Sequence, residues 1–134
     1  FSFAPAIQLL NIDQLLDLSK FFIDNYSTKH CRIAWVSQVR FPIVCDYDIL
    51  PSDYKDNVAD QIEKNIKIID DANTVKHLLG HAKDLRKENY TTEQKKSYQK
   101  MFIQYNDHQD KFRKTTSWRK LMPDLESTLT NSTR

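Results

Sequence analysis

Apolar residues follow two different patterns along this chain. The run Ala6–Leu10 is almost wholly apolar, and Cys31–Val39 is β-branched and aromatic, which is typical of buried strands. Between them, apolar residues recur at helical spacing and predict a helix that ends near Asn25–Tyr26; they are Ile12, Leu15, Leu16, Phe22 and Ile23. The first part of the chain therefore predicts a strand, a helix and a second strand.

Beyond the loop Phe41–Leu50 the pattern is helical. Ser52 is placed to cap a helix, and a further helix is expected from about Asn73 to Lys87. The first of these two helices has a regular apolar stripe, formed by Tyr54, Val58, Ile62, Ile66 and Ile69.

The last third of the chain opens with a helix-start signal. Thr91, followed three residues on by Gln94, has the pattern of a capping box, and the helix behind it ends near Lys114. We expect a short structured tail, Trp118–Leu125, and a frayed end, Glu126–Arg134. The apolar stripe of the long helix is Tyr98, Met101, Phe102, Tyr105, Gln109 and Phe112.

These elements predict an α/β fragment over residues 1–50, followed by a helical part over residues 51–134. A strand–helix–strand unit pairs its strands in parallel, and two strands cannot bury both faces of a sheet. We therefore expect the first part to be an incomplete piece of a larger α/β domain. The start at Phe1 rather than Met fits a piece of a longer or processed protein.

Charge and composition narrow the function classes. The chain has 134 residues with 20 Lys+Arg against 18 Asp+Glu, a net charge of only +2, so a strongly basic nucleic-acid binder is not expected. The single glycine, Gly80, excludes a glycine-rich phosphate loop. No apolar run approaches the roughly 18 residues that span a bilayer, so no membrane association is expected.

Cysteine and histidine give weak signals. Cys31 and Cys45 leave open a disulfide, metal ligation with other residues, or two reduced thiols, and the last interpretation is favoured. His77 and His81 lie four apart, as a helical metal pair would, but no third ligand is evident and a solvated helix face is favoured. No metal site and no catalytic residue are predicted.

Two further patterns remain as alternatives. Basic residues with interleaved aromatic ones, from Lys83 to Lys87 and from Lys111 to Lys120, resemble an RNA-binding face, but nearby acids dilute the charge. Three glycosylation sequons begin at Asn25, Asn89 and Asn131. With two cysteines and no initial Met, they keep a mature secreted domain open.

Two stretches carry a family resemblance. One is Leu50-Pro51-Ser52-Asp53-Tyr54-Lys55, and the other is Asp110–Leu125, with Asp110, Arg113, Trp118, Arg119, Pro123 and Leu125 as its specific positions. Both resemble the C-terminal end of twitch-type (SPASM/twitch-like) radical S-adenosylmethionine proteins. The run Ala6–Asn11 is also similar to a late barrel strand of that family.

The resemblance implies a fold and a setting. It implies the last strand–helix–strand elements of a partial (β/α) barrel, plus a C-terminal helical extension that covers the substrate side. The partner would be the N-terminal remainder of the same cytoplasmic polypeptide, which would hold a 4Fe-4S cluster and S-adenosylmethionine. The CxxxCxxC cluster motif is absent here, so this segment alone is expected to bind no cofactor and to be inactive.

The resemblance also places candidate site residues. Gln8 and Asn11 would end one barrel strand and bind the cofactor, while Gln38 and Arg40 would follow the next strand and face an unknown substrate. The alternative for Asn11 is that it only caps the next helix. Trp118 is expected to dock on the helices, with Arg119 pairing an acid. The alternative function for the whole chain is a non-enzymatic helical interaction module, intracellular or secreted.

Overall fold

The fold is predominantly helical. The structure, a computed structural model, describes residues 2–3, 6–26, 32–33, 38–114 and 116–133. In those ranges β structure is confined to β1 (Ser2–Phe3), which pairs in parallel with β2 (Arg32–Ile33), and to one isolated parallel bridge between Ile7 and Gln38. The predicted α/β fragment with the strands of a partial barrel is therefore wrong.

Two backbone hydrogen bonds, one to a distant segment and one to a nearby side chain, explain why Ala6–Leu10 is not a strand. The backbone N–H of Leu9 donates to the carbonyl of Cys45 at 2.9 Å, and that of Gln8 donates to the Asn11 side chain at 2.9 Å. These donors are therefore not available to a neighbouring strand, and among the described residues the Ile7 bridge stays isolated. Of the predicted strand Cys31–Val39, residues 31 and 34–37 lie outside the described ranges.

The N-terminal helix follows this turn. The short 3-10 helix η1 (Ile12–Gln14) leads into α1 (Leu15–Tyr26), as the apolar spacing predicted. The apolar residues of the turn and of this helix start are buried rather than left at a sheet edge: Ile7, Leu9, Ile12, Leu15 and Leu16.

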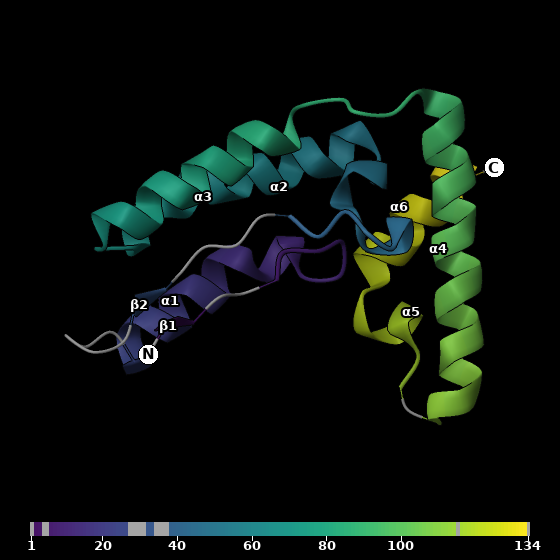
Figure 1. The fold of residues 1–134 in the computed structure, drawn as a ribbon, viewed down its shortest axis with the longest axis horizontal. Helices are drawn as coiled ribbons and strands as arrows, with labels where there is room; N and C mark the ends of the chain where they lie inside the picture. The colour runs from purple at the N-terminus through teal and green to yellow at the C-terminus, as the bar shows by residue number, and fades with distance from the viewer. Residues whose placement is uncertain (1, 4–5, 27–31, 34–37, 115, 134) are drawn as a thin grey trace.

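Two antiparallel helices form one arm of the molecule. They are α2 (Ser52–Asn65), which continues into the 3-10 helix η4 (Ile66–Ile68), and α3 (Ala72–Leu85). They lie side by side, with α1 and the short strand pair beneath them (Figure 1). Pro51 occupies the N-cap position and Ser52 is the first helical residue, so the predicted cap is wrong by one residue.

The second arm is built on the longest helix. The capping box of Thr91 and Gln94 is confirmed at the start of α4 (Thr92–Arg113), which runs across the end of the α2–α3 pair (Figure 1). Against it pack α5 (Trp118–Leu121) and α6 (Pro123–Thr133). The predicted fraying of the C-terminal end is wrong, because Leu125 and Leu129 are buried and anchor α6.

The segment Phe41–Leu50 joins the two arms. It was expected to be a loop, but it forms two 3-10 turns, η2 (Ile43–Cys45) and η3 (Tyr47–Ile49), that pack on α4. Tyr47, Ile49 and Leu50 are at most 1% exposed. This segment is therefore central to the core, and it carries the polar cluster described next.

Candidate functional site

Two aspartates are buried in the segment that joins the arms. Asp46 is 0% exposed and Asp48 is 1% exposed. A buried carboxylate is costly unless hydrogen bonds and charge compensate it. Their side-chain donors come from two segments, one eight residues before them and one more than 40 residues after them. We name the set of Gln38, Arg40, Asp46, Asp48, Asn89 and Tyr90 the aspartate cluster.

Asp46 is fully hydrogen-bonded. Its Oδ1 accepts from the Gln38 amide and from the backbone N–H of Asp48 at 2.9 Å, and its Oδ2 accepts from the Tyr90 hydroxyl at 2.9 Å. Burial and this hydrogen bond raise the pKa of Tyr90 to about 12. Asp46 therefore connects Gln38, at the Ile7–Gln38 bridge, with Tyr90 in the linker between α3 and α4.

Asp48 is only partly satisfied. Its Oδ2 accepts from Arg40 Nη1 at 3.1 Å and from Asn89 Nδ2 at 2.6 Å, whereas its buried Oδ1 has no hydrogen-bond partner. The adjacent Tyr47 has a pKa raised above its ordinary value, first by burial and then by the charge of Asp48. Asp48 is thus a buried acceptor whose Oδ1 has no hydrogen-bond partner among the described residues.

The two predicted substrate-facing residues meet in this cluster. Gln38 and Arg40 bond to Asp46 and Asp48 respectively. The Arg40 side chain is 57% exposed, while its partner Asp48 is 1% exposed. Nη1 of the guanidinium is therefore held by the buried Asp48, while most of the Arg40 side chain is exposed to solvent. A planar anion such as a carboxylate or phosphate would fit the remaining N–H donors.

The two predicted cofactor-binding residues lie in a turn of their own. Asn11 Oδ1 accepts from the Gln8 backbone N–H, and Asn11 Nδ2 donates to the carbonyl of Ala6 at 2.8 Å. Asn11 is the N-cap of η1 by position but makes no side-chain cap bond. Both ends of its amide therefore serve local backbone, and a cofactor role for Gln8 and Asn11 stays a prediction.

Two buried lysines, Lys55 and Lys95, contact the linker between α3 and α4, which also carries Asn89 and Tyr90 of the aspartate cluster. Lys55 is 0% exposed and donates from Nζ to the carbonyl of Lys87 at 2.7 Å. Glu88 pairs with Lys55 at 3.3 Å and also with Lys95. Burial raises the pKa of Glu88, but hydrogen bonds led by Lys95 outweigh it and leave that pKa below its ordinary value. The lysine of the Leu-Pro motif is thus a structural element.

The second motif with a family resemblance folds into a compact joint. Asp110 accepts from the Trp118 backbone N–H at 3.1 Å, and Asp107 accepts from the Trp118 indole at 3.0 Å. Arg119 pairs with Asp107 at 2.8 Å and with Glu126 at 3.0 Å. The Trp118 ring meets Phe102 edge to face. The predicted docking of Trp118 and the acid pairing of Arg119 are confirmed.

Metal-binding chemistry is sparse. Within the described ranges, no three His, Cys, Asp or Glu side chains come together as a metal site. Cys45 is a free thiol whose pKa is raised by burial, and Cys31 lies outside those ranges. His77 and His81 both sit on α3, and burial lowers the pKa of His81.

An acidic hollow lies between the start of α1 and α2. Its volume is about 280 Å³, and Asp13, Asp17 and Asp124 line it together with the Tyr54 ring. Burial raises the pKa of Asp13, and the Tyr54 hydroxyl lies 3.5 Å from its carboxylate. Amides and the apolar side chains of Leu16, Val58 and Ile62 complete the lining, and its charged groups are all carboxylates, so the hollow differs in charge from the Arg40 end of the aspartate cluster.

The aspartates and Lys55 were not predicted from the sequence as site residues. The signal for Lys55 was present, because it lies three, four and seven residues before Val58, Ala59 and Ile62, on the buried side of α2. The signal for Asp46 and Asp48 was weaker, since two acids in a predicted loop normally face water.

Comparison with known proteins adds no further constraint. No family model, no curated protein and no solved structure matches this chain. Among the described residues, no helix is both long enough and apolar enough to cross a membrane.

Proposed function

We propose that this chain is the non-catalytic C-terminal segment of a radical S-adenosylmethionine enzyme and that Gln38 and Arg40 face the substrate. The helical fold differs from the barrel end that the resemblance implies. The proposal therefore rests on the sequence motifs and on the aspartate cluster, rather than on the architecture.

One observation supports the proposed substrate-facing role of Arg40. Arg40 is 57% exposed, yet it is anchored on Asp48, which is 1% exposed. A surface arginine in an ordinary exposed pair is mobile and contributes little to stability. An arginine held from below by a buried carboxylate is instead pre-oriented, which lowers the entropy cost of binding an anionic group.

The CxxxCxxC motif that would hold the iron–sulfur cluster is absent from this sequence. In this proposal the cluster and S-adenosylmethionine are therefore held mainly by the N-terminal remainder of the polypeptide, with Gln8 and Asn11 as the residues of this segment proposed to face the cofactor. This chain would contribute the binding and orientation of the substrate.

Reading the coding DNA upstream of Phe1 is the first experiment. An in-frame extension that encodes CxxxCxxC supports the proposal. A signal peptide directly upstream, or an immediate start codon, overturns it. In the extended enzyme, Arg40→Ala should raise KM for the substrate about tenfold, the loss of one charge-assisted hydrogen bond. Lys76→Ala, an exposed change on α3, is the matched control.

A second candidate is the non-enzymatic helical interaction module. The observation in its favour is the outer side of α4, where Met101, Tyr105 and Phe112 are 45%, 47% and 70% exposed. Aromatic side chains and methionine are enriched where proteins meet partners. A cooperative thermal melt of the 134-residue chain, without dye binding to exposed apolar surface, favours this candidate over a segment that needs its remainder.

A further inference from the structure

The long helix α4 has an apolar row that it does not bury in this chain. The row consists of Met101, Tyr105, His108 and Phe112, all exposed, and we name it the outer row. Its spacing of four, three and four residues keeps the four side chains on one face of the helix. The sequence had placed three of these residues in a core stripe, and the structure corrects that prediction.

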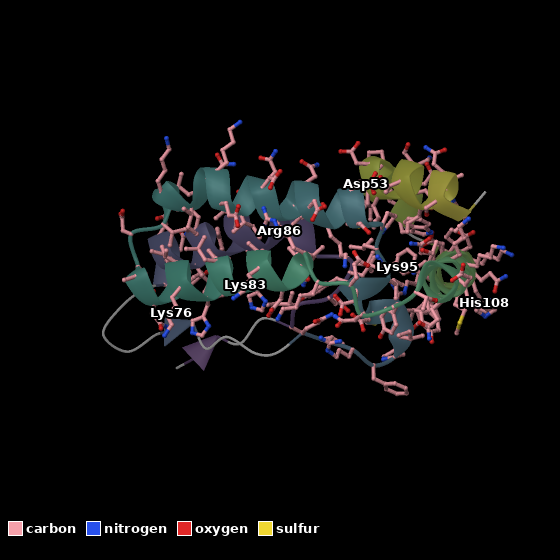
Figure 2. The ribbon with its side chains drawn as sticks, turned by 90° about the horizontal axis from the view of Figure 1, so that it is seen from above. Asp53, Lys76, Lys83, Arg86, Lys95 and His108 are labelled. Carbon is pink, nitrogen blue, oxygen red and sulfur yellow. The ribbon has the colours of Figure 1, made fainter. Side chains whose placement is uncertain are left out.

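The buried face of α4 is a different one. Phe102, Gln99 and Asn106 are 0%, 2% and 8% exposed and face the rest of the molecule. Gln99 donates to the carbonyl of Ile49 in η3 at 2.6 Å. Figure 2 looks along α4 and shows Lys95 on the side toward the other helices and His108 on the far side. The outer row therefore points away from the aspartate cluster.

Unpaired positive charge accompanies the outer row. Lys100 and Lys111 lie beside it on the helix and are exposed, and Lys96 continues the same side one turn earlier. None of the three forms an ion pair with a residue in the described ranges, although the charge of Lys111 contributes to the lowered pKa of Asp107. The exposed acid of this helix face, Glu93, lies in the first turn, two turns before the row begins.

The acids nearest to the outer row are already engaged. Asp107 bonds to Arg119 and to the Trp118 indole, and Asp110 bonds to the Ser117 hydroxyl at 2.9 Å. Arg86, the C-cap residue of α3, is paired with Asp60 and Glu63, whereas Lys76 and Lys83 of α3 are exposed and form no ion pair among the described residues. What distinguishes the outer side of α4 is that its exposed lysines accompany a row of four exposed side chains.

We propose that the outer row of α4 binds an amphipathic helix of a partner protein, one whose apolar stripe is flanked by Asp or Glu. A row spaced by four, three and four residues is the repeat by which one helix packs its side chains between those of another. The lysines beside it then face the partner's carboxylates, which gives both orientation and a faster encounter. In an antiparallel pair of two copies of this chain the lysine rows would face each other, so a second copy is a poor occupant.

This inference goes beyond the substrate-facing role of Arg40, because it uses the opposite side of α4. The probe is a fluorescein-labelled synthetic helix of 21 residues, with Leu at alternating three- and four-residue spacing and Glu at the flanking positions. A second peptide carries Lys in place of every Glu. Anisotropy should show the Glu peptide binding at least about tenfold more tightly than the Lys peptide at low salt, and less tightly as salt screens the lysines.

Matched variants distinguish peptide binding at the outer row from non-specific binding elsewhere on the protein. Tyr105→Ser with Phe112→Ser should weaken binding of the Glu peptide about tenfold or more. Lys100→Glu with Lys111→Glu should reverse the preference between the two peptides. The control, Lys76→Glu with Lys83→Glu, makes the same charge change on exposed residues of α3 and should leave binding unchanged (Figure 2).

Three results would overturn the inference. The first is equal binding of the two peptides, or an equal effect of the α3 control. The second is a dimer in sedimentation that Phe112→Ser dissolves, since the occupant would then be a second copy. The third is tighter binding of polyuridylate than of the Glu peptide, lost in Tyr105→Ser, which would make the row a stacking surface for single-stranded RNA.

Discussion

Lys55 Nζ donates to the backbone carbonyl of Lys87 at 2.7 Å, which joins α2 to the linker that starts α4. The lysine is 0% exposed, so its ammonium depends on this carbonyl and on Glu88 for the hydrogen bonds that water would otherwise supply. Lys95 of α4 also donates to the Ser52 hydroxyl of α2 at 3.2 Å, so two lysines connect α2 with α4 and its linker. Loss of the Lys55 contact should therefore lower the stability of the whole fold and not only that of α2.

The Lys55→Met variant should lower the free energy of unfolding by about 1–3 kcal/mol. Methionine keeps the length and the apolar stem of the side chain but leaves the Lys87 carbonyl without a donor. Lys64→Met, at an exposed position of the same helix, should change the unfolding free energy by less than about 0.5 kcal/mol. Urea unfolding of both variants measures the difference, and equal effects would contradict a buried role for Lys55.

The aspartate cluster predicts an order of effects between two matched variants. Asp46→Ala leaves three donors unpaired: the Gln38 amide, the Asp48 backbone N–H and the Tyr90 hydroxyl. Asp48→Ala frees the donors of Arg40 and Asn89, which are exposed and regain water. Asp46→Ala should therefore destabilise the protein by about 1–2 kcal/mol more than Asp48→Ala.

Thermal or urea unfolding of the two alanine variants tests this order, with equal removed volume in each. The unpaired Oδ1 of Asp48 strengthens the expectation, because deleting that atom breaks no bond. If Asp48→Ala is the more damaging change, then Oδ1 has a partner that compensates its charge in solution.

The sequence allowed some parts of this fold to be predicted, because their causes are local. The capping box of Thr91 and Gln94 needs only residues three apart, and it is present. Helical spacing predicted α1, α2, α3 and α4. The docking of Trp118 and the pairing of Arg119 followed from a motif in which the interacting residues are close in the chain.

The parts that were missed depend on contacts between distant segments. Ala6–Leu10 has strand composition, but Leu9 gives its N–H to Cys45, which no pattern near Leu9 reveals. The outer row and the buried face of α4 are both rich in side chains that suit a core, so periodicity alone could not tell which one faces inward. Asp46 and Asp48 are buried because Asn89 and Tyr90 reach them from more than 40 residues away.

The single bridge at the N-terminal turn predicts a local difference in stability. The Val39 backbone N–H donates to the Ile7 carbonyl at 2.8 Å, without a ladder beyond it among the described residues, whereas Leu85 lies within α3 and is 0% exposed. Amide hydrogen exchange should be at least about a hundredfold faster at Val39 than at Leu85, since an isolated bond opens without unfolding the helices. Equal protection would show that the turn and the α2–α3 pair open as one unit.

The ion pair between Asp107 of α4 and Arg119 of α5 predicts how the free energy of unfolding changes at acidic pH. Hydrogen bonds from Arg119, and then from Trp118, lower the pKa of Asp107 below its ordinary value of 3.8. The unfolded chain therefore takes up the proton first as pH falls, so the stabilisation is complete above that ordinary value and is lost as pH drops through the lower value of the folded state. Because both side chains are more than a third exposed, at 40% and 36%, screening limits the effect to about 0.5–1 kcal/mol.

Asp107→Asn isolates this contribution. The variant should be less stable than the parent chain at pH 6 by about that amount, and the difference should shrink as pH falls below 3.8, because the parent carboxylate then takes up its proton. Asp56→Asn, at an exposed position of α2 that forms no ion pair with a described residue, should change the free energy of unfolding by less than Asp107→Asn does. Urea unfolding across this pH range measures both. A difference between Asp107→Asn and the parent that stays constant with pH would mean that the carboxamide disturbs the Trp118 packing, and that the charge of Asp107 contributes nothing.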